Sequence, residues 1–147
     1  MTSDADIAAL VARFEDCTQP VAQFRHRQHL QVAWWLLRSE SLLSAMPRFI
    51  DGLRRYATSI GQAQIYHETM TWAYLLLVHD RLERAGRQRS WDEFEHDHPE
   101  LFTRELVHAY WKPETLASPL ARRTFILPDA TVAESSPSAA NRTGDRR

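Results

Sequence analysis

Apolar residues recur three and four residues apart through most of this chain, which is the spacing of one face of an α-helix. Four long helices are predicted on this basis, over residues 4–15, 26–38, 42–60 and 67–82. The last of these stretches is the least polar part of the chain, so we expect it to form a central helix that is buried on most sides. The short connector before it should place it antiparallel to the third helix.

Residues that favour helix ends mark the limits of these segments. Ser3 or Asp4 can cap the first helix, and Gly61 is a natural stop for the third. Pro47 lies within the third segment, where a proline removes a backbone hydrogen bond. We therefore expect either a late start capped by Ser44 or a kink at Pro47.

Shorter helices are expected in the C-terminal third of the chain. The run from Ser90 to Glu93 has the pattern of a capping box that opens a helix, and Pro99 should end it. Two further short helices are predicted over residues 101–110 and 119–125.

The fold class that these patterns predict is all-α, a single-domain helical bundle of four main helices plus short C-terminal helices. We place the domain at residues 1–130 and expect residues 131–147, which have no apolar periodicity, to be a disordered tail. Composition agrees, because the 147 residues include only four glycines and 44% of them are hydrophobic, which is enough for one substantial core.

Charge and cysteine content narrow the classes of function. The formal net charge is −1 and the basic residues are interspersed with acids, so nucleic acid is not an expected partner. Cys17 is the single cysteine, which excludes an intramolecular disulfide and fits a reducing compartment. No stretch approaches the ~20 apolar residues of a membrane span, and no signal-peptide pattern opens the chain. We expect a cytoplasmic protein without membrane association.

Two histidines lie at the start of the second predicted helix, on its apolar side. His26 and His29 are three residues apart, about 60° around a helix axis, and they line up with Leu30. Imidazoles in an apolar core cost free energy unless their nitrogens have partners. The pair is therefore either a set of metal ligands or two core side chains that bond backbone carbonyls or neighbouring acids.

A second polar cluster, formed by Tyr66, His67, Glu68 and Thr69, opens the least polar helix. Glu68 projects about 100° away from His67, so those two side chains cannot both be ideal ligands on a regular helix. Glu68 could instead be a carboxylate favoured by the helix N-terminus, and Thr69 could bond the local backbone.

The two clusters should meet, because the second and fourth helices run parallel in an up-down bundle and begin at the same end. His26, His29 and His67 could then converge on one ion. Three neutral imidazoles, an open position and a nearby carboxylate describe a catalytic zinc or iron centre. In this hypothesis Glu68 orients a ligand or shuttles a proton, and Tyr66 donates a hydrogen bond to the substrate.

Two other pairs have blander interpretations. Glu93 and His96 have the spacing found in carboxylate di-iron bundles, but a capped, solvated helix explains them better. His79 and Asp80 resemble the histidine–aspartate pair of phosphohydrolases, yet the further ligands of such a site are not evident. We interpret them as a salt bridge or a solvated helix end.

The motifs resemble those of a group of small bacterial all-helical proteins. The resemblance is carried by residues 24–30 with Ala33-Trp34, by residues 66–69 with Thr71, and more loosely by residues 121–129. It spans about Phe14 to Asp129. No activity is established for that group, so the resemblance supports the choice of residues and implies no reaction.

Three hypotheses for function follow. The leading one is a metal-binding helical protein, an enzyme that acts on a small-molecule substrate through the histidine-rich site. The first alternative is a metal-free enzyme or binder in which the same polar pocket acts directly on a small molecule. The second alternative is a helical interaction module, possible as a homodimer, whose exposed aromatic residues, such as Trp35 or Trp111, dock a partner helix or a second copy.

Overall fold

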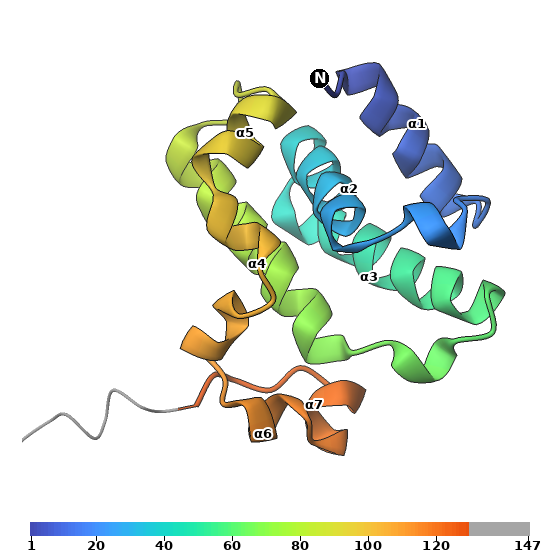
Figure 1. Cartoon of the computed structure of the whole chain (residues 1–147), viewed down its shortest axis with the longest axis vertical. Helices are drawn as coiled ribbons and strands as arrows, with labels where there is room; N and C mark the ends of the chain where they lie inside the picture. The colour runs from blue at the N-terminus through green and yellow to red at the C-terminus, as the bar shows by residue number, and fades with distance from the viewer. Residues whose placement is uncertain (130–147) are drawn as a thin grey trace, which may run out of the picture.

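The computed structural model describes residues 1–129, and every regular element in this range is helical (Figure 1). The four longest helices are α1 (Asp4–Glu15), α2 (His26–Ser39), α3 (Leu42–Ser59) and α4 (Glu68–Ala85). The shorter α-helices are α5 (Trp91–Asp97), α6 (Pro113–Leu116) and α7 (Pro119–Arg123). The 3-10 turns are η1 (Val21–Gln23), η2 (Ala63–Ile65), η3 (Pro99–Phe102) and η4 (Leu106–Ala109). The predicted all-α class is confirmed for this range, whereas the predicted tail, residues 131–147, lies outside the described residues.

Side chains cap the helices close to the predicted ends. Ser3 and Asp6 form a reciprocal capping box at the start of α1, and Ser90 and Glu93 form another at the start of α5. The Glu93 carboxylate thus accepts a hydrogen bond from the Ser90 N–H at the start of α5, which agrees with the interpretation of this segment as a capped helix. Gly61 follows α3 with a φ of +72°, a left-handed conformation that glycine adopts without strain.

Helix α3 begins at Leu42, as the predicted range 42–60 expects, so the alternative of a late start capped by Ser44 is wrong. Ser41 caps this helix instead, because its hydroxyl accepts a hydrogen bond from the Ser44 backbone N–H at 3.2 Å. Pro47 therefore lies inside α3. Proline deprives the Leu43 carbonyl of its helical donor, but both residues lie on the exposed side of α3, where water can replace that bond.

The prediction of a helix over residues 101–110 is wrong, because two 3-10 turns, η3 and η4, form there instead. Thr103 follows the first of these turns. Its hydroxyl donates to the Glu100 carbonyl at 3.0 Å, and its own carbonyl accepts a hydrogen bond from the Tyr74 hydroxyl at 2.8 Å. A long-range partner on α4 thus takes the carbonyl that a continuous helix would use internally.

The helices pack around one apolar core. α2 contacts α1, α3 and α4, and α4 also contacts α3, η3, η4 and α7. The largest fully buried side chains include Trp34, Trp91, Phe14, Phe94 and Leu30. α1 and α3 approach closely because Gly52 has no side chain where the Phe14 ring lies.

The two tryptophans that the interaction-module hypothesis named as exposed docking residues are covered to different extents. Trp111 is only 5% exposed, and its Nε1–H donates to the Ile126 carbonyl at 3.0 Å. Trp111 therefore does not fit that alternative, because the C-terminal segment folds back over it. Trp35 is partly buried against the core.

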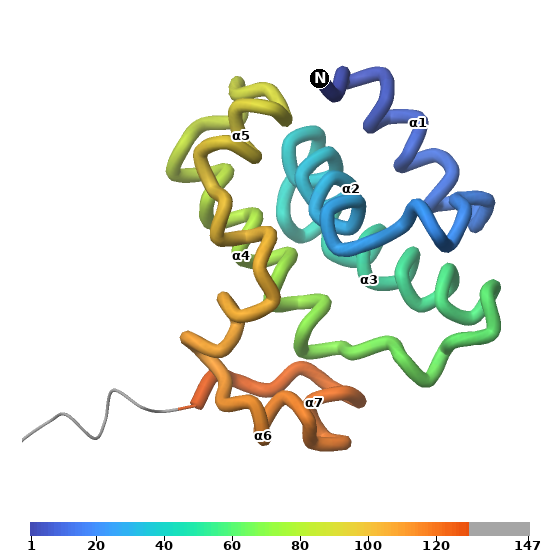
Figure 2. The backbone as a smooth tube through the Cα atoms, in the orientation of Figure 1, coloured from blue at the N-terminus to red at the C-terminus, as the bar shows by residue number. Residues whose placement is uncertain are grey.

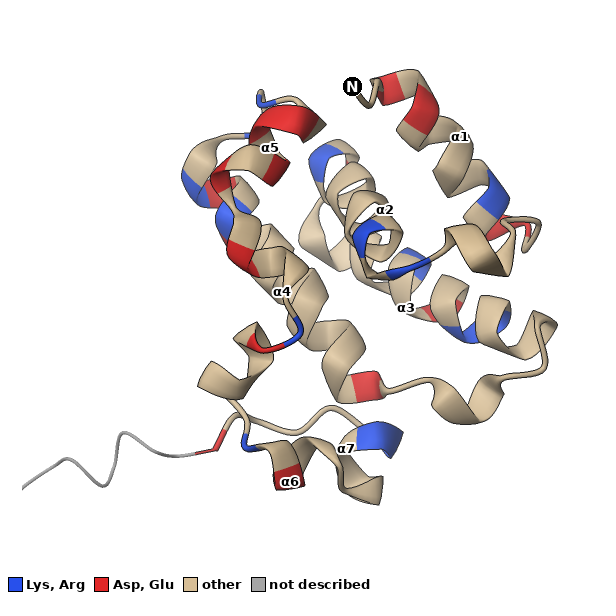
Figure 3. Ribbon diagram, in the orientation of Figure 1, with Lys and Arg blue, Asp and Glu red and all other residues tan. Residues whose placement is uncertain are grey.

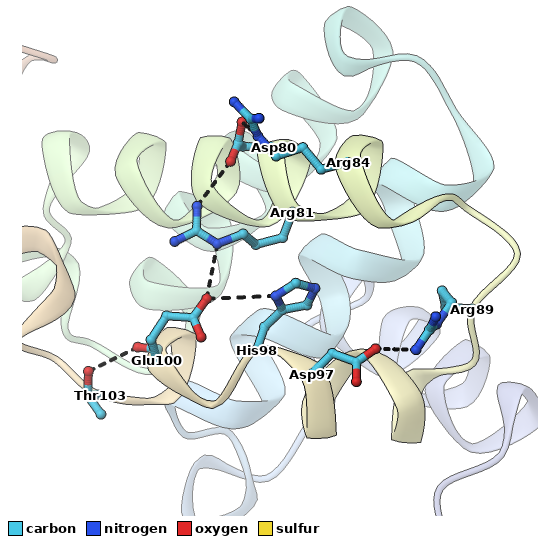
Figure 4. A network of polar contacts seen from close by, with 8 residues as sticks. All are labelled: Asp80, Arg81, Arg84, Arg89, Asp97, His98, Glu100 and Thr103. Carbon is cyan, nitrogen blue, oxygen red and sulfur yellow. Dashed lines mark hydrogen bonds and ion pairs between the residues drawn. The ribbon is translucent and has the colours of Figure 1, made fainter.

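A network of ion pairs ties the C-terminal half of α4 to the segment that follows α5 (Figure 4). The Arg81 guanidinium lies 3.0 Å from the Glu100 carboxylate and 3.0 Å from the Asp80 carboxylate. Asp80 also accepts from Arg84 at 2.9 Å, which agrees with the salt-bridge interpretation of that aspartate. Because Glu100 belongs to η3, the network fixes the backbone just before residues 103–105.

Acidic and basic residues are interspersed over the helices in the view of Figure 3, which agrees with the mixed charge pattern of the sequence. Within residues 1–129, no helix is both long enough and apolar enough to cross a membrane.

Candidate functional site

A cavity of about 510 Å³ lies between the N-terminal half of α2, the C-terminal half of α3 and the start of α4. The connector from α3 through η2 to α4, residues 60–67, supplies another part of its wall and can be followed in Figure 2. The apolar lining includes Phe24, Phe49, Leu53, Ile60 and Met70. A mainly apolar cavity of this volume lies within the range of small-molecule sites in proteins.

The cavity brings together four of the five residues predicted to form the site. His26, His29, Tyr66 and His67 all line it. They meet because His26 is the first residue of α2 and His67 is the N-cap of α4, and both helices begin at this cavity. Glu68 is 9% exposed and lies behind the wall, where it contacts Tyr66.

The His67 ring is fully engaged with the backbone. Its Nδ1 accepts a hydrogen bond from the Met70 N–H at 3.1 Å, which caps α4. Nε2 lies 2.7 Å from the Leu116 carbonyl and therefore donates to it. Both nitrogens have partners, so His67 fastens α4 to α6 and offers no free lone pair to a metal ion.

The His26 ring bonds the backbone through one nitrogen. Nε2 lies 2.9 Å from the Leu101 carbonyl and must donate to it, which leaves Nδ1 without a proton in the neutral ring. The ring packs edge-on against Tyr74, with centroids 4.6 Å apart. Burial lowers the pKa of His26, and the positive charge of Arg104 adds to that shift against the opposing effect of the Leu101 bond.

Of the three histidines that line the cavity, His29 is the one whose ring has no hydrogen-bond partner among residues 1–129. The ring packs edge-on against Phe24, with centroids 4.3 Å apart, and faces the cavity. Burial, together with the charges of His26 and Arg104, lowers the pKa of His29 to about 4. At neutral pH the ring therefore presents one N–H donor and one nitrogen acceptor to whatever occupies the cavity.

These contacts bear on the predicted metal centre. Among residues 1–129, no three histidine, cysteine, aspartate or glutamate side chains are grouped as a metal ion would need. His26 and His67 each donate to a backbone carbonyl, which is the alternative that the sequence left open. The bond of His26 leaves its Nδ1 free for a ligand, but both nitrogens of His67 are engaged, so a three-histidine centre would need His67 to release the Met70 N–H. The contacts of His67 therefore favour the metal-free pocket.

Tyr66, predicted to donate a hydrogen bond to the substrate, and Glu68, predicted to orient a ligand or shuttle a proton, bond each other and an arginine. The Tyr66 hydroxyl donates to Oε1 of Glu68 at 2.5 Å, and Oε2 of Glu68 accepts from the Arg54 guanidinium at 2.8 Å. Burial, followed by the bond to Glu68, raises the pKa of Tyr66. The Tyr66 proton is thus committed to Glu68, and its hydroxyl oxygen is left to accept a hydrogen bond from a ligand.

Sequence reasoning missed Arg54 and Arg104. Arg54 stands one helix before its partner Glu68, and no local spacing connects them. Arg104 lines the cavity from the segment between η3 and η4, which was predicted to be helical. An exposed arginine in an irregular segment leaves no periodic signal, so only the fold could reveal its position.

The C-terminal segment holds the cavity wall in place. The Arg122 guanidinium donates to the carbonyls of Gln64, Ile65 and Tyr66 at 3.1 to 3.3 Å. The Thr69 hydroxyl donates to the Thr124 carbonyl at 2.9 Å. Residues 66–69 and residues 121–129 are thus in direct contact.

Comparisons of the chain with protein-family models, with curated proteins and with solved structures find no match, so the site is interpreted from its own geometry.

Proposed function

We propose that this protein binds a small organic molecule in the cavity between α2, α3 and α4, and that His29 supplies the polar contact which orients it. The observation that carries the proposal is an imidazole without a hydrogen-bond partner on the wall of a mainly apolar cavity. A few polar groups on the wall of an apolar pocket fix the orientation of a ligand. The His29 ring is free to bond such a ligand, whereas both nitrogens of His67 already bond the backbone.

The low pKa of His29 favours binding over proton transfer in the empty site. A general base works best when its pKa lies near the operating pH, and a pKa of about 4 is far below neutrality. The neutral ring is, however, a good donor and acceptor for a hydroxyl, carbonyl or carboxylate group. The apolar wall from α3, which includes Phe49 and Leu53, would hold the body of the ligand.

A ligand screen with two matched variants tests the proposal. Compounds that raise the melting temperature of the wild-type chain should lose that effect in Leu53→Trp, because the larger side chain fills the cavity. They should keep it in Leu43→Trp, which places the same side chain at an 82% exposed position of α3. Circular dichroism would establish that both variants remain helical.

Two results would contradict the proposal. Ligands that stabilise Leu53→Trp as strongly as wild type would bind somewhere other than this cavity. A stoichiometric metal ion in the purified protein, whose removal by chelator lowers the melting temperature and whose binding is lost in His29→Ala, would support the metal centre instead.

A further inference from the structure

We propose that the ligand of this cavity, whose existence rests on the proposed function, is an organic carboxylate with an apolar body, and that Arg104 pairs with its carboxylate group. The first observation is the charge of the side chains that line the cavity. Arg104 is the one ionised side chain among the described residues that line the cavity, since its histidines are neutral and no aspartate or glutamate reaches it. An apolar cavity with a single positive group at its wall selects a molecule with a single negative group.

The Arg104 guanidinium is available for such a pair. It forms no ion pair and donates no hydrogen bond within residues 1–129, and the neighbouring Glu105 does not contact it as a salt bridge. Arg81, by contrast, already pairs with Asp80 and Glu100. Because a guanidinium offers a planar fork of donors, it can hold a carboxylate through two parallel hydrogen bonds.

The backbone that carries Arg104 is held from several sides, so the guanidinium is presented on a fixed segment. The Leu101 carbonyl accepts from His26, and the Thr103 carbonyl accepts from Tyr74. Glu100, shown with Thr103 in Figure 4, is tied to Arg81 on α4. These bonds fix the point at which the Arg104 side chain leaves the main chain, beside the cavity.

The charge of Arg104 is felt on the cavity wall. Arg104 lines the same cavity as His26 and His29, and its charge contributes to lowering the pKa of both rings. The same wall therefore offers a carboxylate the guanidinium of Arg104 and the N–H of His29 as donors. This arrangement suits a monocarboxylate, because a phosphate would bring more charge and more acceptor oxygens than one arginine and one imidazole can satisfy.

Calorimetric titration of the full-length chain with matched probes tests the inference. The probes are octanoate, 1-octanol and octylamine, with 3-phenylpropanoate and 3-phenylpropanol as an aromatic pair. In the wild type, we expect each carboxylate to bind at least about tenfold more tightly than its alcohol, and octylamine to bind most weakly. Arg104→Gln should reduce the carboxylate preference to near one. Arg123→Gln is the control, because Arg123 is also exposed and unpaired within the described residues but lies on α7, away from the cavity lining.

The outcomes separate this inference from the proposed function. If the alcohols bind as tightly as the carboxylates, or if Arg104→Gln leaves the preference unchanged, the carboxylate inference is overturned while the small-molecule site stands. If no compound of either series binds, neither proposal survives these probes. Loss of the preference in Arg123→Gln as well would assign it to the overall charge and overturn the role of Arg104.

Discussion

Acidification should destabilise this protein through His29. The pKa of His29 is about 4 in the folded chain, against an ordinary 6.5, because burial, repulsion from His26 when that ring is protonated and the charge of Arg104 disfavour its protonated form. In the unfolded chain the same ring takes up a proton below about pH 6.5. The unfolded state therefore gains protons between pH 6.5 and 4 that the folded state does not bind, and the free energy of unfolding falls as the pH falls through that window.

The size of this loss follows from the two pKa values. Each unit of difference is worth about 1.36 kcal/mol, so His29 alone removes up to about 3 kcal/mol by pH 4. Above pH 6.5 the ring is neutral in both states, and its contribution to the pH dependence vanishes. A loss of this size is a large fraction of the 5 to 15 kcal/mol that is typical of a small domain.

Urea unfolding followed by circular dichroism at about pH 7.5 and about pH 4.5 measures the effect. Wild type should lose about 2 to 3 kcal/mol more between these conditions than His29→Leu, which has no titrating ring at that position. His108→Asn serves as the control, because His108 is exposed and its removal should leave the wild-type loss unchanged. Taking the difference between two pH values cancels any constant cost of the substitution.

Equal losses in wild type and His29→Leu would refute the reasoning. An NMR titration that places the His29 ring near its ordinary pKa of 6.5 would do the same, and it would show that water in the cavity solvates the charged ring.

Two further predictions concern the packing that shapes the site. Gly52→Ala should lower the free energy of unfolding by about 1 to 2 kcal/mol in thermal unfolding. The new Cβ would lie 2.5 Å from Cζ of the fully buried Phe14, and this overlap outweighs the gain in helix propensity. Wild-type stability in the variant would contradict the close contact. Thr69→Val should lower the free energy of unfolding by about 1 to 3 kcal/mol and speed amide exchange in residues 124–126, because it removes the hydroxyl that donates to the Thr124 carbonyl and accepts from the Ile126 N–H. Thr58→Val, at an exposed threonine, should have neither effect.

Local pattern was sufficient to predict the long helices. Residues 4–15 were predicted as a helix and form α1 over the same range, because an apolar face and a capping serine act within a few residues of each other. The expectation that His26 and His67 share one end of the molecule also agrees with the structure, since both line the same cavity. Helix periodicity and the lengths of the connectors were enough for both inferences.

The rest depended on partners that are distant in the sequence. The turns η3 and η4 replace a helix because Tyr74 takes the Thr103 carbonyl, and sequence periodicity carries no information on that bond. Arg104 reaches the cavity only because the same segment is held against α2 and α4. The choice between ligand and structural histidine likewise depended on carbonyls far along the chain, at Leu101 and Leu116.

The three histidines of the cavity therefore divide into two kinds, and this division explains how a cluster that resembles a metal centre can serve a different purpose. His26 and His67 each join the first turn of a long helix to a C-terminal carbonyl, so they position the wall. His29 has no such bond and keeps its polarity for the cavity. A centre of three histidines would need the His67 ring to give up its bond to the Met70 N–H, whereas the proposed organic ligand needs only His29 and the free guanidinium of Arg104, which both line the cavity.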